Sequence, residues 1–129
     1  MTSAPRLSHS AALILKALSL GYCFGLDIME ATGLPSGTVY PALRRLERDA
    51  LVVARPYSTR PLRMVYELSA AGAELAGALR LLAGWGARNV SGAPAPRHSV
   101  CGTPMEARWW CPTCEQPVAE DEGEELHFA

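Results

Sequence analysis

The chain has 129 residues, of which 49% are hydrophobic and 19% charged, so it can form one domain with a real core and a small appendage. No apolar run reaches the roughly 18 residues of a membrane-spanning helix, and residues 1–10 lack the charged start and apolar run of a signal peptide. We therefore expect a cytoplasmic protein with no membrane partner, whose four cysteines stay reduced.

Charge is distributed unevenly along the chain. Residues 1–97 carry eleven Lys or Arg and six Asp or Glu, a net charge of +5, whereas residues 98–129 carry one Arg and seven Asp or Glu, a net charge of −6. A basic body with an acidic tail fits a polyanionic partner for the body, and it also fits simple solvation of the tail. Charge alone does not decide between these two interpretations.

Two helices are predicted within the first 33 residues. Apolar side chains recur at helical spacing over residues 8–20, where Ser8 or Ser10 can cap the start and Gly21 can end the helix. The stretch from Phe24 to Gly33 has the length of about two turns, and its final glycine stops it. We expect its buried face to comprise Leu26, Ile28 and Met29.

A third helix is predicted from PSGTVYPALRRLE, residues 35–47, although Pro41 lies inside it. With Ser36 as N-cap, Pro41 begins the second turn and removes one early backbone bond, to Gly37, which has no side chain to clash. One side of this helix is then an apolar stripe of Val39, Leu43, Leu46 and Ala50. The other side offers small polar groups at the helix start and guanidinium groups along its length.

Two runs rich in β-branched and aromatic residues, 51–57 and 63–69, predict a hairpin with residues 58–62 as its exposed tip. A final helix is predicted from Ser69 to about Trp85, with Leu75, Leu79 and Leu82 on one side. Three helices, a hairpin and a further helix make a mainly α fold with a small β wing. This is the winged helix-turn-helix arrangement, in which the third helix enters the DNA major groove.

The third helix and the hairpin together favour double-stranded DNA as the partner. Small residues at the helix start let the backbone approach base edges closely, and arginines with a tyrosine hydroxyl can reach phosphates. The alternative is an ordinary surface helix with solvated arginines. Arg55, Arg60 and Arg63 weigh against it, because they flank or occupy the hairpin tip where a wing would meet phosphate.

The run GLPSGTVYPALRRLERDALV resembles the recognition segment of PadR-type transcriptional regulators, and the resemblance covers about residues 8–83. It implies a homodimeric winged-helix repressor or regulator that binds a partly palindromic operator. Members of that family often sense small aromatic molecules, but this sequence specifies no effector. The expected DNA-binding residues are Ser36, Gly37, Thr38, Tyr40, Arg44, Arg45, Arg60 and Arg63.

The segment after residue 97 contains two ligand pairs with the same spacing, His98-x2-Cys101 and Cys111-x2-Cys114. Two such knuckles can converge on one tetrahedral Zn²⁺, and so short a segment has little core of its own and needs a staple. The segment resembles a short zinc ribbon with a structural zinc ion. His127 is an alternative fourth ligand in place of His98.

The sequence therefore divides into four parts: a winged-helix domain with a dimerisation helix, 6–88; a linker, 89–97; a zinc-ribbon-like module, 98–118; and an acidic tail, 119–129. Three alternatives stay open for the cysteines, namely unliganded thiols in a disordered tail, a redox Cys-x2-Cys, and a metal- or redox-responsive regulator. A protein-interaction adaptor is the alternative function. An enzyme is not expected, because no catalytic arrangement, phosphate loop or open metal site is readable.

Overall fold

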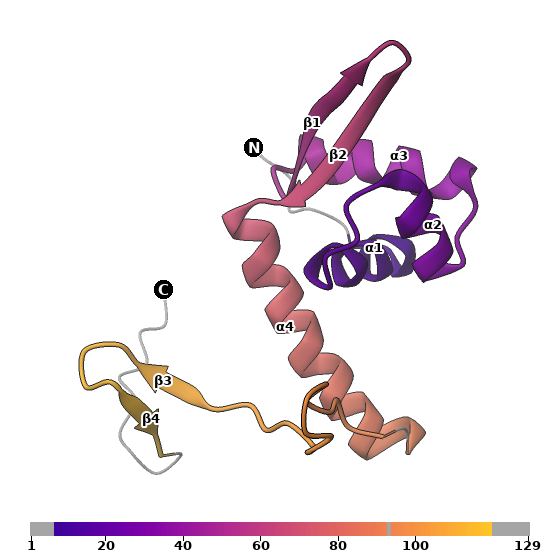
Figure 1. Cartoon of the computed structure of the whole chain (residues 1–129). Coiled ribbons are helices and arrows are strands. Elements are labelled where there is room, and N and C mark those ends of the chain that lie inside the picture. Colours follow the sequence, from indigo (N-terminus) through magenta and orange to yellow (C-terminus); the bar gives the residue numbers. More distant parts are fainter. Residues whose placement is uncertain (1–6, 93, 120–129) are drawn as a thin grey trace, which may run out of the picture.

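The structure, a computed structural model, describes residues 7–92, which we call the body, and residues 94–119, which we call the C-terminal module (Figure 1). The order of elements in the body agrees with the predicted winged helix-turn-helix. Its elements are α1 (His9–Ser19), α2 (Gly25–Thr32), α3 (Ser36–Arg48), β1 (Val52–Thr59), β2 (Leu62–Leu68), α4 (Ala70–Gly86) and the π-helical turn η1 (Ala87–Ser91). The module contains β3 (Trp109–Cys111) and β4 (Gln116–Val118).

The core of the body lies where α1, α2 and α3 meet the base of the β1–β2 hairpin. Ile14 of α1, Ile28 of α2 and Leu43 of α3 are each 0% exposed, and twelve buried residues form one continuous cluster. Full burial of one such side chain is worth about 1.5–3 kcal/mol. This cluster fixes the orientation of α3, because α3 packs through it against α1, α2 and β1.

The first two helices begin and end close to the predicted places. Ser8 is the N-cap of α1, where its Oγ accepts a hydrogen bond from the Ala11 N–H at 3.1 Å. Gly33 ends α2 in the left-handed conformation, with φ 72°. The predicted burial of Leu26 is wrong, since this side chain is 68% exposed. Residues two apart project to nearly opposite sides of a helix, so Leu26 and the buried Ile28 cannot share a face.

Both ends of α3 differ from the prediction. Pro35, and not Ser36, is the N-cap, and its carbonyl accepts the Thr38 and Val39 N–H groups at 3.0 Å. A proline suits this place, because the backbone N–H that proline lacks would have no intrahelical partner there. At the other end the helix stops at Arg48, and Ala50 adopts φ 59° and lies exposed instead of continuing the apolar stripe. The bond from Leu51 N–H to Leu46 O, 2.9 Å, closes this end.

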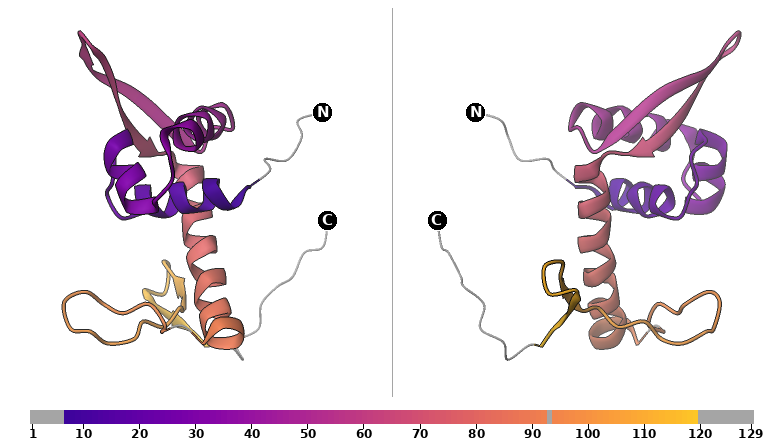
Figure 2. Two further views of the ribbon diagram at one scale, coloured as in Figure 1. Left: turned by 90° about the vertical axis from the view of Figure 1, so that its right-hand side faces the viewer. Right: turned by 60° about the vertical axis from the view of Figure 1, so that its left-hand side comes forward.

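Strands β1 and β2 form the predicted wing, which projects beyond the helices (Figure 2). The strands run further than expected, so that the turn is only Arg60 and Pro61 and not residues 58–62. A register shift between Pro56 and Ser58 leaves Tyr57 without a partner residue in the ladder. The Tyr57 ring instead packs edge-on against Phe24, with ring centroids 5.2 Å apart.

The chain before α2 ties the wing to the helices. Phe24 pairs with Val65 as an isolated antiparallel bridge, and the Tyr66 N–H donates to the Cys23 carbonyl at 2.8 Å. Cys23 is half-buried in this contact, so it belongs to the body and not to the C-terminal module. The position of the wing relative to α3 is therefore set by backbone bonds as well as by packing.

Helix α4 starts against α1 and β2 and then extends away from them (Figures 1 and 2). Ser69 caps its start by accepting the Gly72 N–H at 3.0 Å, and a Cβ on Gly72 would overlap the Leu51 carbonyl oxygen. Beyond the first turns α4 loses its cover, since Leu82 is 64% and Trp85 54% exposed. No helix in the described residues is long and apolar enough to cross a bilayer.

Residues 89–91, at the start of the predicted linker, are part of η1, which Gly92 ends at φ 65°. Strands β3 and β4 lie towards the far end of α4, away from α1–α3 (Figure 1). A contact between Arg80 Nη2 of α4 and Met105 Sδ, 3.6 Å, connects the module to the body.

Candidate DNA-binding surface and cysteine module

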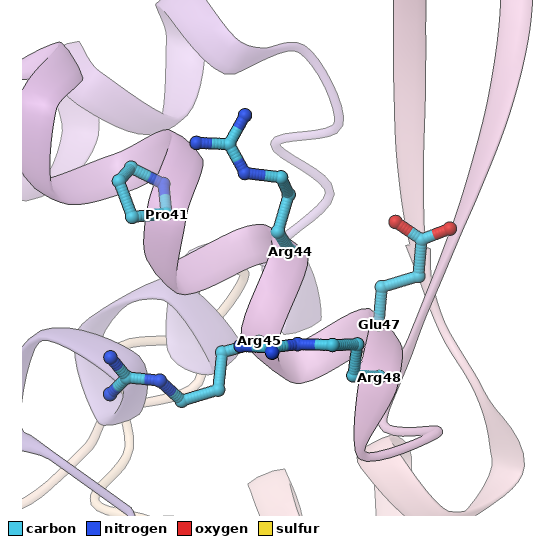
Figure 3. A pocket seen from close by; sticks show the side chains of 5 residues that line it. All are labelled: Pro41, Arg44, Arg45, Glu47 and Arg48. Atoms are coloured by element: carbon cyan, nitrogen blue, oxygen red, sulfur yellow. The ribbon is translucent and has the colours of Figure 1, made fainter.

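Helix α3 presents one continuous exposed face. Its buried residues are Val39, Ala42, Leu43 and Leu46, which turn the remaining positions outwards. An open hollow runs along this outer side, and Figure 3 shows the residues that line it: Pro41, Arg44, Arg45, Glu47 and Arg48. Ser36 and Gly37 are exposed at the N-terminal end of the same helix. The face therefore combines a small, polar tip with a basic flank.

The arginines of this face are available to an external anion. None of the carboxylates that the structure describes forms an ion pair with Arg44, Arg45 or Arg48. Glu47 lies on the side of α3 that faces the wing strands (Figure 3). Exposed guanidinium groups without an internal partner are the groups that bind DNA phosphates and guanine edges.

Tyr40 differs from the other predicted contact residues, because its half-buried ring packs against the hydrophobic core. A Cβ on Gly25 would overlap the Tyr40 ring, so this glycine allows α2 and α3 to approach closely. Tyr66 of β2 lies near the same junction. Burial raises the pKa of Tyr66, the charges of Tyr40 and Glu47 raise it further, and Arg44 lowers it. Tyr40, Arg44 and Glu47 of α3 therefore lie close enough to Tyr66 for their charges to act on its hydroxyl.

The wing supplies a second group of cations. Arg60 occupies the two-residue turn and Arg63 lies opposite Ser58 on β2, both of them exposed. Arg55 is partly engaged, since its Nη2 lies 3.7 Å from Glu67 Oε2 in an exposed pair. Arg60 and Arg63 therefore retain the free positive charge of the wing near its tip, as the sequence predicts.

All of the predicted contact residues lie on α3 or the wing, and all except Thr38 and Tyr40 are exposed. Thr38 is half-buried near the α3 start, beside the exposed Ser36 and Gly37. Arg48 was not among the predicted contacts, yet it lines the hollow with Arg45. Its spacing of three and four residues from the two earlier arginines places it on the same side of a helix, and this signal is readable in the sequence.

The four predicted metal ligands are arranged as two separate pairs. His98 Nδ1 lies 3.2 Å from Cys101 Sγ, and the Cys114 N–H donates to Cys111 Sγ at 3.5 Å. In residues 7–92 and 94–119, no three His, Cys, Asp or Glu side chains are clustered so as to hold a metal ion. The alternative ligand His127 lies outside the described residues.

The exposed Cys101 thiol is hydrogen-bonded within the protein, to His98 and Thr103. Hydrogen bonds with the hydroxyl and then the backbone of Thr103, and with His98, lower the pKa of the Cys101 thiol from 9.0 to about 7. The thiolate form of this cysteine is therefore accessible near neutral pH, and the thiolate is the form that coordinates metals.

Comparison with known proteins supports the same fold and chemistry. The family model of HxlR-like helix-turn-helix proteins matches residues 11–93. A helix-turn-helix transcriptional regulator of Mycobacterium tuberculosis is 32% identical over 110 residues, which cover 82% of this chain and 70% of that protein. These matches identify a DNA-binding regulator of transcription and not an enzyme.

Solved structures show the fold. A transcription factor structure from Pseudomonas aeruginosa superposes with a TM-score of 0.69 and 20% identity, covering 92% of this chain and 83% of that one. A PadR-like transcription factor from Bacteroides fragilis superposes with a TM-score of 0.52 and 28% identity, covering 64% and 84%. The resemblance to PadR-type regulators thus extends to a structure, while the matching family model is a different one. The chain belongs to the HxlR-like helix-turn-helix family of transcriptional regulators.

Proposed function

We propose that this chain is a dimeric repressor that acts in the cytoplasm and binds a partly palindromic operator, with one α3 in the major groove of each half-site. The observation that carries the proposal is the outer face of α3, where three arginines without an internal ion pair flank a tip of small residues. Arg60 and Arg63 on the wing would contact the phosphates beside each half-site. The resemblance of this segment to PadR-type regulators supports the same role.

The dimer is supported by the uncovered half of α4. Leu81, Leu82 and Trp85 are 50%, 64% and 54% exposed, although they stand on one of the most apolar helices of the body. Apolar surface on a helix that leaves its own core is typical of a site for another chain, and a symmetric dimer is the commonest solution. Two copies would then present two α3 helices to two half-sites of one duplex.

The proposal is tested by selecting bound sequences from random duplex DNA and measuring their affinity by fluorescence anisotropy at several salt concentrations. Arg44→Ala with Arg45→Ala should weaken binding, by about 1–3 kcal/mol for an arginine that reads a base. The slope of log affinity against log salt should fall by about one for each arginine that contacts phosphate.

A matched control removes two cations elsewhere. Arg88 and Arg108 lie beyond α4, on η1 and in the C-terminal module, so the double alanine variant changes the net charge equally. It should retain the affinity and the salt slope. Equal losses in both double variants would mean that net charge, and not the α3 face, drives binding. Absence of binding to any duplex would favour the alternative, a winged-helix adaptor for protein partners.

A further inference from the structure

Two turns of the C-terminal module have the same design. In the first, the His98 N–H donates to the Thr103 carbonyl at 2.9 Å, next to an antiparallel bridge between residues 97 and 104. In the second, Cys111 pairs with Gln116 at the end of the β3–β4 ladder. Each closing pair therefore encloses four residues and is separated by the same five positions. This repeat is a feature of the backbone, independent of which side chains it carries.

The backbone conformation repeats in detail as well. The residue after the second ligand residue, Cys101 or Cys114, is left-handed in both turns, Gly102 at φ 72° and Glu115 at φ 52°. A non-glycine residue rarely adopts this conformation, so its presence at Glu115 shows that the turn demands it. The Gly102 N–H donates to the His98 carbonyl at 2.7 Å, which tightens the first turn.

Each turn brings its two ligand residues together. His98 Nδ1 and Cys101 Sγ are 3.2 Å apart, close enough to share one ion. In the second turn the Cys114 N–H points at the Cys111 sulfur, as backbone amides do in turns that hold thiolates on a metal. The two turns thus supply two pairs of ligands of the kinds that zinc prefers, thiolate and imidazole.

The described residues of the module form no hydrophobic core. None of its residues between 94 and 119 is buried, and the strands β3 and β4 have three residues each. A two-stranded hairpin of this kind is marginal in water by itself. Small domains without a core are commonly held by a metal ion, whose binding energy becomes folding energy.

We propose that His98, Cys101, Cys111 and Cys114 of one chain bind a single Zn²⁺ ion that draws the two turns together. Nine residues separate Cys101 from Cys111, and at about 3.3 Å per residue they can span roughly 30 Å, so the turns can meet without movement of the body. Four protein ligands fill a tetrahedral site and leave no position for water, which makes the site structural and not catalytic.

The test uses the full chain. After purification the zinc content is measured by native mass spectrometry, and the zinc is then exchanged for Co²⁺, whose visible spectrum reports thiolate ligation and tetrahedral geometry. We expect one ion per chain and a spectrum with both features. Half an ion per chain would overturn the proposal, because it would mean that two chains share one site.

The variants locate the ligands. Cys101→Ser and Cys114→Ser should lose the ion during washing with a chelator, and His98→Ala should do the same. His98→Cys should restore binding and shift the Co²⁺ spectrum towards that of four thiolates. Retention of the ion by Cys114→Ser or by His98→Ala would overturn the assignment.

Two further substitutions serve as controls. Cys23→Ser removes the one cysteine that lies in the body, and His127→Ala removes the remaining histidine of the C-terminal segment. Both should keep one ion per chain and the unchanged Co²⁺ spectrum. Loss of the ion in His127→Ala would overturn the role of His98. None of these measurements depends on DNA binding, so the metal site and the proposed function stand or fall separately.

Discussion

The body and the C-terminal module are held together in different ways. In the body, twelve buried residues from three helices and the wing base form one apolar cluster. In the module no described residue is buried, and the order comes from backbone bonds within two tight turns. Hydrophobic burial scales with the area removed from water, so it can stabilise the body but contributes little to the module.

This difference indicates that the module, and not the body, is the part that can order or unfold in response to its surroundings. The face of α3 that we assign to DNA stands on the rigid core of the body, as precise recognition requires. The module contacts α4 through an exposed hydrogen bond between Arg80 and Met105. A structure held by turns can therefore order or unfold while the exposed face of α3 is preserved.

The comparison is tested most severely by removing apolar atoms from each region. Leu43 is 0% exposed in the body, whereas Val100 is 85% exposed in the module. Leu43→Ala should lower the free energy of unfolding by about 2–5 kcal/mol, because it leaves a cavity in the core. Val100→Ala should change it by less than about 0.5 kcal/mol. Urea unfolding followed by far-UV circular dichroism measures both.

The same pair of variants also shows whether the two regions unfold together. If they are independent, Leu43→Ala should leave the zinc content of the chain unchanged under conditions where its helices are partly unfolded. Loss of zinc in step with loss of helix would show that the body supports the module, and the contrast between the two regions would fail. If Leu43→Ala does not fold at all, Ile28→Val is the milder substitute, at about 0.5–1.5 kcal/mol.

A smaller effect comes from the left-handed residues other than glycine, one of which lies in the described part of each region. Ala50 has φ 59° at the end of α3, and Glu115 has φ 52° in the second turn of the module. Ala50→Gly should raise the melting temperature of the body, with a gain of about 0.5–1 kcal/mol, because glycine adopts this conformation without steric cost. Glu115→Gly relieves the same strain in the module and should leave the melting temperature of the body unchanged. A fall in stability in Ala50→Gly would contradict this account of the helix end.

Ala50 also shows where sequence reasoning stops. The helical spacing of apolar residues predicts a stripe on α3 that continues to Ala50, but periodicity does not reveal where a helix ends. No glycine or asparagine marks the position, and the carbonyl of Ala50 is used instead by the Ser69 hydroxyl, which donates to it at 2.6 Å. A contact between residues 19 apart in the sequence cannot be read from a local pattern.

The order of elements and the exposed face of α3 are more accessible to prediction than their details. Helical spacing and the wing strands gave the order of elements, because each has an apolar face that must be buried. The partial burial of Tyr40 could not be foreseen, since it depends on the absence of a side chain at Gly25 on another helix. The exposure of Leu26 likewise follows from how α2 is rotated, which the short period of that helix does not determine.

The smallest effect concerns a tyrosine of the body at the base of the wing. Burial raises the pKa of Tyr66, so the unfolded chain releases this proton at a lower pH than the folded chain. The resulting contribution to stability is complete below about pH 10, the ordinary tyrosine value, and is lost as the pH rises through the folded pKa. Tyr66→Phe should therefore show a shallower loss of stability above pH 10 than the unsubstituted protein.

Arg44 provides the converse variant, because its charge lowers the pKa of Tyr66. Arg44→Ala should raise that pKa further and steepen the loss of stability above pH 10, an effect measured by thermal melts over a series of alkaline buffers. Identical slopes of stability against pH in the unsubstituted protein and in Tyr66→Phe would show that folding does not raise the pKa of the Tyr66 hydroxyl. The C-terminal module offers a clear contrast, because none of its described residues is buried. The pH dependence above 10 should thus belong to the body, and it should survive deletion of the module.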